Sequence, residues 1–301
     1  MQISNEKGMQ TKLKSVFGYD STFNLKMSLI VATLGRDIEL VRFLDFLCKQ
    51  EYLNFEVVVV DQNENELLKP ILNSFADRLS IKHIRCQRGL SHARNVGLKH
   101  ISGDVVVFPD DDCWYSSDVL KKVAIFMDAH PEYAGLTGRS IDDQRPNAYR
   151  WFHLRSGSVT KINVCRRATS YTIFLRSEVI GATGEFDEGL GVGAESGRIA
   201  AEELDYLVRV LNAGYDIYYD HQLCVFHREP RVDSKGLRKR AYGYSLGWGY
   251  FLRKHRYPLW FVLNQWFRAA GGILLNAIAG DIETARYHLA VLKGRIQGWR
   301  C

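Results

Sequence analysis

The stretch DVVVFPDDD, residues 104–112, joins an apolar, β-rich run directly to three consecutive carboxylates. Similar runs precede it at 28–33 (SLIVAT), 54–61 (NFEVVVVD) and 81–86 (IKHIRC), and the segments between them carry apolar residues at helical spacing. Strands that alternate with helices in this way predict an open, mixed but mainly parallel α/β sheet flanked by helices. Ligands of such sheets bind beyond the carboxyl ends of the strands, so Asp61 and the three aspartates are expected at one edge.

Composition places the chain among globular proteins. Its 301 residues are 46% hydrophobic and 25% charged, which excludes a disordered or fibrous chain and leaves one large or two small domains. The six cysteines lack the spacing of a zinc site and are interpreted as reduced thiols. No apolar run of signal-peptide length opens the sequence, so a cytoplasmic location is expected. We expect an N-terminal extension at 1–26, an α/β domain at 27–227 and a helical C-terminal region at 228–301.

The C-terminal region differs from the rest in charge and in aromatic content. Residues 228–301 hold 14 Lys and Arg against 4 Asp and Glu, whereas residues 1–227 are net acidic. Its most apolar segment, 258–280, is interrupted by polar residues, so we expect it to lie on a membrane or to pack within the protein. Interfacial tryptophans and basic clusters favour the inner membrane surface, whereas a helical cap with an aromatic core is the alternative. The tryptophans of this region are Trp248, Trp260, Trp266 and Trp299, and its clustered basic residues are Arg238, Lys239, Arg240, Arg253, Lys254 and Arg256. No recognised nucleic-acid-binding motif is present, and no nucleic-acid partner is expected.

Asp110, Asp111 and Asp112 repel one another, so a compensating cation is expected. Oxygen ligands of this kind suit Mg²⁺ or Mn²⁺, with a substrate diphosphate completing the coordination. An acidic turn that caps the following helix is the alternative. His227 follows the last clear strand, where it is either a further ligand or a structural histidine.

Other polar residues also have two interpretations each. Asp61 either accepts a nucleobase N–H or simply begins a loop. Glu202, Glu203 and Asp205 either compensate the dipole of a helix or supply a general base facing the metal site. Ser91 is expected to cap the helix that follows it, and the glycine-rich segment 189–199 is expected to be a mobile loop.

In this order, the motifs resemble those of an inverting family 2 glycosyltransferase with the GT-A fold, over about residues 27–227. SLIVATLGR resembles its opening nucleotide-binding segment, VVVVDQNEN its base-contacting strand, RGLSHARNVGLKH the helix before the metal strand and FPDDD its D-x-D motif. GEFDEGLGVGA followed by AEELDYLVRVLNAG resembles the acceptor loop and the catalytic helix. Two departures stand out: Glu202-Glu203 replaces the usual Glu-Asp pair, and Ala32-Thr33-Leu34-Gly35 replaces the frequent Pro-Thr-Tyr-Asn turn.

The resemblance implies a role for each matching residue. The residues that would bind the donor are Thr33, Asp61, Arg94, Asn95, Asp110 and Asp111. Asp110 and Asp112 would hold Mg²⁺ or Mn²⁺, and His227 is a further candidate ligand. Glu203 would be the catalytic base, and Glu202 is the alternative candidate for that role. The donor would be a nucleotide diphosphate sugar, covered by the 189–197 loop.

The acceptor would be a saccharide or lipid-linked saccharide at the cytoplasmic membrane surface, as in bacterial surface polysaccharide or glycolipid assembly. The alternatives are a sugar nucleotidyltransferase, whose usual glycine-rich phosphate loop is missing, and a catalytically silent scaffold.

Overall fold

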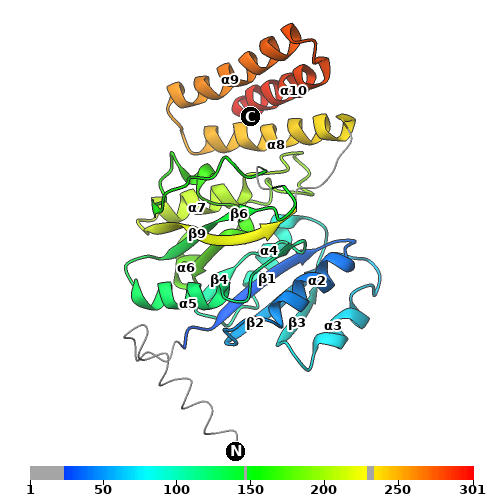
Figure 1. Ribbon diagram of the computed structural model, residues 1–301, viewed down its shortest axis with the longest axis vertical. Helices are drawn as coiled ribbons and strands as arrows, with labels where there is room; N and C mark the ends of the chain where they lie inside the picture. Colours follow the sequence, from blue (N-terminus) through cyan, green and yellow to red (C-terminus); the bar gives the residue numbers. More distant parts are fainter. Residues whose placement is uncertain (1–23, 146–147, 229–233) are drawn as a thin grey trace, which may run out of the picture.

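A mixed β-sheet forms the centre of the computed structural model, which describes residues 24–145, 148–228 and 234–301 (Figure 1). Its strands are β1 Met27–Thr33, β2 Phe55–Asp61, β3 Ile81–Arg85, β4 Val105–Val107, β5 Cys113–Trp114, β6 Gly135–Ile141, β7 Gly157–Ser158, β8 Ile173–Arg176 and β9 Ile217–His227. The strand order is β3-β2-β1-β4-β8-β6-β9-β5, and β7 pairs with β9. The longest ladders, β1–β2 and β6–β9, are parallel, whereas β8 runs antiparallel to β4 and β6. The predicted mixed, mainly parallel sheet is confirmed.

Helices cover both faces of this sheet, and β2 is therefore buried on both sides. Val57 and Val59 belong to one hydrophobic cluster and Val58 and Val60 to another, as the two-residue period of a strand requires. The first cluster includes residues of α2, α3 and α5, and the second residues of α4, α6 and α7. The helices are α2 Ile38–Leu47, α3 Lys69–Phe75, α4 Leu90–Leu98, α5 Val119–Ala129, α6 Glu178–Thr183 and α7 Glu202–Asn212, with 3₁₀ turns η1 Val164–Arg166 and η2 Ser170–Thr172.

The start of α4 differs from expectation. The helix begins at Leu90 with Gly89 as its N-cap residue, so the prediction that Ser91 caps it is wrong. The Ser91 hydroxyl instead donates to the carbonyl oxygen of Leu190, at 2.6 Å. A buried hydroxyl takes whichever acceptor the fold brings within reach, and here that acceptor is 99 residues away.

Three further helices, α8 Ser234–Lys254, α9 Leu259–Ile278 and α10 Ile282–Arg300, lie above α7 (Figure 1). Their backbones approach their neighbours closely. A Cβ atom on Gly247 of α8 would lie 2.4 Å from the Ala200 carbonyl oxygen, and one on Gly298 of α10 would lie 2.0 Å from that of Leu246. Only glycine fits at such crossings, so these positions fix how α8 packs against the start of α7 and against α10.

Ion pairs and apolar contacts attach the C-terminal helices to the sheet. Asp205 of α7, fully buried, pairs with Lys254 at 2.7 Å and with His255 at 2.8 Å. The cluster on that face of the sheet continues through Phe251 of α8 to Val262 of α9. The predicted boundary at residue 228 stays a prediction, and residues 1–23 of the predicted N-terminal extension lie outside the described part of the chain.

The aromatic and basic residues of this region divide between interior and surface. Trp248, Trp266 and Trp299 pack against the core, as in the helical-cap alternative, whereas Trp260 is 62% exposed. Among the basic residues, Lys254 pairs with acidic residues of the α/β domain and Arg238 with a glutamate of α10. Across the described ranges, no helix has both the length and the apolar character needed to cross a bilayer.

Candidate active site at the carboxyl edge of the sheet

The expected acidic edge is present beyond β1, β2 and β4. Thr33 and Asp61 are paired in the register of β1 and β2, and Asp110 forms a parallel bridge with Ala32 just past the end of β4. Strand pairing therefore brings the aspartates after β4 beside the turn that follows β1. The three carboxylates and the 33–36 turn share one edge, as the sheet topology predicts.

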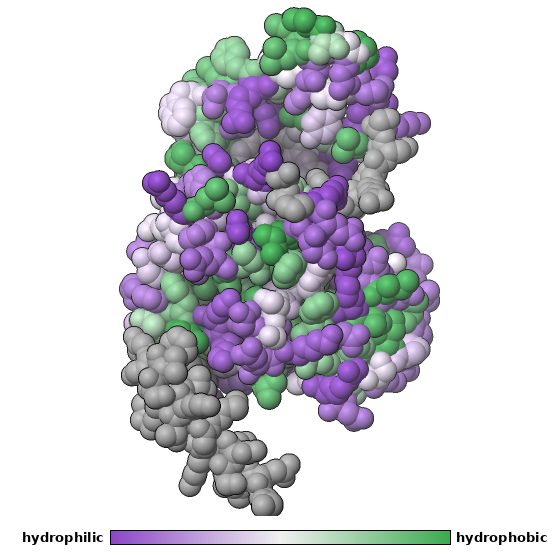
Figure 2. Space-filling model, in the orientation of Figure 1, coloured by the Kyte–Doolittle hydropathy of each residue, from purple (hydrophilic) through white to green (hydrophobic). Residues whose placement is uncertain are grey.

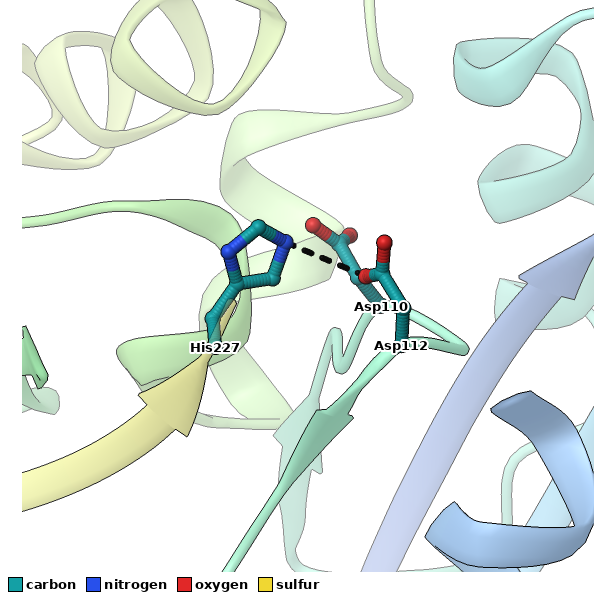
Figure 3. A group of neighbouring side chains, drawn as sticks. All are labelled: Asp110, Asp112 and His227. Carbon is teal, nitrogen blue, oxygen red and sulfur yellow. Dashed lines mark ion pairs between the residues drawn. The ribbon is translucent and has the colours of Figure 1, made fainter. Parts of the chain in front are cut away.

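His227 reaches this edge through the antiparallel pairing of β5 with β9. That register sets Cys113 opposite His227, so the histidine lies beside Asp112. Its Nε2 atom forms an ion pair with Asp112 Oδ1 at 3.1 Å (Figure 3). Ligand atoms from Asp110, Asp112 and His227 all lie within 4.8 Å of one another, and the three side chains are partly buried. Two oxygens and one imidazole nitrogen at this separation fit Mn²⁺ or Mg²⁺.

Aromatic residues orient the His227 ring. The Tyr149 hydroxyl hydrogen-bonds to Nδ1 at 2.7 Å, and Tyr171 stacks on the ring with centroids 4.8 Å apart. With Nδ1 occupied, Nε2 is the atom that faces the aspartates. A metal-binding histidine is typically held through its second nitrogen in this way.

Arg36, which sequence reasoning missed, neutralises part of the acidic edge. Its guanidinium pairs with Asp111 at 2.8 Å and also with Asp112. Burial opposes ionisation of Asp112, but His227 and Arg36 outweigh it and lower the pKa of Asp112 to about 2. For Asp111 burial prevails over Arg36 and raises the pKa to about 7. Burial also raises the pKa of Asp110. Burial thus makes ionisation of Asp110 and Asp111 costly, and a bound divalent cation would offset this cost by stabilising their charged forms.

Arg94 links the acidic edge to the glutamates of α7. It is almost completely buried, and its guanidinium lies 3.3 Å from Asp110 Oδ1 and 2.9 Å from Glu202 Oε1. One side chain therefore spans the space between Asp110 and the first residue of α7. The aspartates Asp110 and Asp112 and the pair Glu202-Glu203, about ninety positions apart in the sequence, lie on the same side of the molecule.

The two glutamates differ in their surroundings. Glu202 is buried and paired with Arg94, whereas Glu203 is partly exposed and, within the described residues, its carboxylate is paired with no other side chain. Burial and the adjacent charge of Glu202 raise the pKa of Glu203 to about 8. A carboxylate with such a pKa is suited to accept a proton near neutral pH.

Asp205, the third acidic residue of α7, faces away from this site. Burial opposes its ionisation, but His255 and Lys254 lower its pKa to about 2. Its contacts are those that hold α8 against α7. Its position in the sequence did not distinguish it from Glu202 and Glu203.

Asp61 and Asn95 are engaged by neighbouring residues. Asp61 accepts hydrogen bonds from the backbone and the side chain of Asn63, both at 2.8 Å, and lies 3.0 Å from His83 Nε2. Asn95 donates to Glu188 and exchanges two hydrogen bonds with the backbone of Phe186. Their predicted donor contacts stay predictions, and Asn95 also shapes the segment that leads to the acceptor loop.

The glycine-rich segment expected to be mobile is hydrogen-bonded to α4. The Leu90 N–H donates to the Val192 carbonyl oxygen at 2.9 Å, and Ser91 contacts Leu190 as described above. Within the loop, the Gly191 N–H donates to the Arg198 carbonyl oxygen at 2.8 Å. In this structure the loop is therefore folded against the start of α4.

Comparison with known proteins gives the family. The family model described as Glycosyl transferase family 2 matches residues 28–180, half of the chain. The chain belongs to glycosyl transferase family 2. The match includes the edge at Thr33, Asp61 and Asp110–Asp112 and ends before the glutamates of α7 and His227.

Curated relatives align with only part of their length. Poly(ribitol-phosphate) beta-N-acetylglucosaminyltransferase TarS of Staphylococcus aureus is 30% identical over 128 residues, which cover 39% of this chain and 22% of TarS. A PGL/p-HBAD biosynthesis glycosyltransferase of Mycobacterium bovis is 30% identical over 167 residues, covering 53% of this chain and 62% of the relative. The chain thus matches less than two thirds of either protein.

Solved structures of glycosyltransferases show the same fold. S. aureus TarS 1-349 in complex with UDP-GlcNAc superimposes with a TM-score of 0.56 at 20% identity, over 90% of this chain and 93% of that one. Mannosyltransferase PcManGT from Pyrobaculum calidifontis, in complex with GDP-Man and Mn²⁺, gives 0.63 at 17% identity, over 96% and 93%. The predicted GT-A fold is confirmed, and the C-terminal helices extend it.

Proposed function

We propose that the protein transfers a sugar from a nucleotide diphosphate sugar to an acceptor hydroxyl, with inversion at the anomeric carbon. The observation that carries this proposal is the link from Asp110 through Arg94 to Glu202, with unpaired Glu203 beside it. Arg94 thereby connects the candidate metal and diphosphate site to the start of α7, where the candidate base Glu203 follows Glu202. The presence of every expected carboxylate, together with the family match, favours transfer over a nucleotidyltransferase or a silent scaffold.

The donor lies, in this proposal, along the carboxyl edge of the sheet. Thr33 and Asp61 contact the nucleoside, and Arg94, Asn95 and Asp111 help to position the donor. Asp110, Asp112 and His227 are the residues that would hold Mg²⁺ or Mn²⁺. When bound, such a cation supplies positive charge that stabilises the leaving diphosphate.

Glu203 acts as the general base. Its carboxylate accepts the proton of the acceptor hydroxyl, and the hydroxyl oxygen attacks the anomeric carbon from the face opposite the diphosphate. The bond from that carbon to the diphosphate oxygen breaks, and one displacement inverts the configuration. Glu202 remains paired with Arg94 and orients the guanidinium toward Asp110.

A donor screen tests the reaction class. Purified protein with Mg²⁺ or Mn²⁺ and a panel of nucleotide sugars is expected to release nucleoside diphosphate slowly, through water in place of the acceptor. Formation of sugar 1-phosphate and nucleoside triphosphate when pyrophosphate is added would indicate a nucleotidyltransferase, and the failure of every donor to bind would indicate a scaffold.

Calorimetry separates the roles of the carboxylates. Asp112→Asn is expected to abolish metal-dependent donor binding, because it removes one ligand of the three-residue cluster. Glu203→Gln is expected to keep donor binding and to lose transfer, because the amide cannot accept the proton. Equal loss of donor binding in both variants would contradict these assignments.

We further propose that the protein works at the inner surface of the cell membrane, on a saccharide or lipid-linked saccharide of a surface polymer or glycolipid. The outer side of α9 carries exposed apolar side chains, visible at the top of Figure 2. These are Leu259, Trp260, Leu263, Phe267, Leu274, Leu275 and Ile278. Their successive spacings of one, three, four, seven, one and three residues keep them along one side of the helix, and the surrounding region is net basic, which suits an anionic bilayer surface.

Vesicle flotation tests this surface. Phe267→Glu and Leu275→Glu change side chains that are 70% and 69% exposed, so the fold should persist while binding to anionic vesicles falls. Leu53→Glu is the matched control, because Leu53 is 77% exposed but lies in the α/β domain between α2 and β2. Unchanged flotation of both α9 variants would refute the proposed membrane face.

A further inference from the structure

A cavity of about 830 Å³ lies between the three C-terminal helices and the 151–166 segment of the α/β domain. Its lining contains four arginines, Arg166, Arg240, Arg268 and Arg295, and no aspartate or glutamate. Aromatic side chains complete the wall, among them Trp151, Tyr244, Trp248 and Tyr287. The volume is in the range of small-molecule binding sites.

The arginines of this cavity are bound only to neutral groups. Arg166 donates to the Trp151 carbonyl oxygen at 2.8 Å, Arg240 to the Tyr244 hydroxyl at 3.0 Å, and Arg295 to the Gln265 carbonyl oxygen at 2.5 Å. Within residues 24–145, 148–228 and 234–301, none of the four guanidinium groups has a carboxylate partner. Arg166 and Arg268 are exposed and Arg240 and Arg295 are half-buried, so the cavity gathers four positive charges that a bound anion could reach.

Two buried donors in the same wall are unsatisfied. Arg295 Nε and Trp248 Nε1 are both inaccessible to solvent and have no hydrogen-bond partner among the described residues. Burial, reinforced by the charge of Arg268, lowers the pKa of Arg295. Buried N–H groups are normally hydrogen-bonded, so these two unsatisfied donors mark side chains of the cavity wall whose N–H groups the described part of the chain leaves without a partner.

One wall of the cavity packs against the segment that precedes the candidate base. Helix α8, which forms one wall, packs at Gly247 against Ala200, two residues before Glu202. Burial raises the pKa of Tyr244 in the same wall, and the charges of Glu202 and Glu203 add to that rise. A molecule bound among the arginines can therefore extend toward Glu203.

We propose that this cavity binds the phosphate or diphosphate group of the acceptor, with the hydroxyl to be glycosylated directed toward Glu203. The proposal rests on the proposed glycosyl transfer and specifies its acceptor as a phosphate-bearing saccharide, polyol chain or lipid. Guanidinium groups match phosphate oxygens in charge and in paired hydrogen bonds. The aromatic side chains provide flat apolar faces for sugar rings. A neutral saccharide would leave all four guanidinium charges without an anionic partner.

Calorimetric titration with inorganic pyrophosphate tests the site directly. EDTA is included, so that the proposed metal-dependent donor site does not capture the probe. We expect saturable binding to the wild type, weakened at least tenfold in Arg268→Gln and in Arg240→Gln. Arg268→Lys is expected to retain part of the affinity, because it keeps the charge. Lys293→Gln is the matched control, since Lys293 is an exposed cation of α10 outside the cavity.

The outcomes separate this proposal from the proposed function. Absence of binding, or equal affinity in the arginine variants and the wild type, would overturn the cavity assignment while leaving donor binding and donor hydrolysis untouched. Loss of pyrophosphate binding in Asp112→Asn but not in Arg268→Gln would place the anion at the donor site and overturn it as well. Failure of the transferase proposal shows in the donor-hydrolysis assay, which uses no pyrophosphate.

A competition arm identifies the source of the phosphate. Phosphatidylcholine vesicles with and without phosphatidic acid are added to the bound pyrophosphate complex. Displacement only by vesicles that contain phosphatidic acid supports the cavity and assigns it a lipid-borne phosphate. Retention of pyrophosphate, with the arginine dependence intact, supports the cavity and assigns it a water-soluble phosphorylated chain.

Discussion

The pH dependence of Glu203 gives a quantitative test of the catalytic assignment. With a pKa of about 8, Glu203 is deprotonated in about 1% of molecules at pH 6, about half at pH 8 and about 90% at pH 9. A base must be deprotonated to act, so the rate should rise roughly tenfold per pH unit below pH 8 and level off above it. The assay is nucleoside diphosphate release from the donor in Mg²⁺ between pH 6 and pH 9.

Two substitutions identify which glutamate acts. Glu203→Gln is expected to reduce the rate by about 10²–10⁴ at every pH, the usual contribution of a general base. Glu202→Gln is expected to remain active and to shift the profile to lower pH. It removes the negative charge that raises the pKa of Glu203, and it leaves Arg94 without its partner on α7. A flat profile, or activity lost in Glu202→Gln and kept in Glu203→Gln, would refute the reasoning.

Three further predictions concern stability and metal binding. The pKa of Asp205 is lowered from 3.8 to about 2, so above about pH 4 its ion pairs should add ~2 kcal/mol to the free energy of unfolding. This contribution should be lost as the pH falls from 4 to 2. Urea unfolding of the wild type and of Asp205→Asn at pH 4 and at pH 2 measures it. Gly298→Ala should destabilise the protein by about 1–3 kcal/mol, whereas Gly271→Ala, in open space on α9, should stabilise it by up to about 1 kcal/mol, as thermal unfolding will show. Tyr149→Phe removes the hydrogen bond to Nδ1 of His227 and should weaken Mn²⁺ binding about 10–100-fold by calorimetry; unchanged affinity would argue against His227 as a ligand.

The α/β half of the fold could be read from local patterns. The runs at β1 and β2 are apolar on both faces, and the helices between strands repeat at 3.6 residues, so each element's type depends on its own side chains. The edge that carries Asp61 and Asp110 follows from parallel strand direction alone. The cap at Ser91 was wrong because a serine near a helix start has several possible acceptors, and a distant loop supplied the one it uses.

The sequence by itself determined the α/β layering and the acidic strand ends, because hydrophobic period and strand direction are local properties of the chain. Only the tertiary structure decided which carboxylates act together. The β5–β9 register brings His227 to Asp112, a buried Arg94 joins Asp110 to Glu202, and Asp205 turns instead to the C-terminal helices. Each of these contacts joins residues that are far apart in the chain. The charged side chains acquire a specific role only when burial excludes water, because they then interact with one another and no longer with solvent.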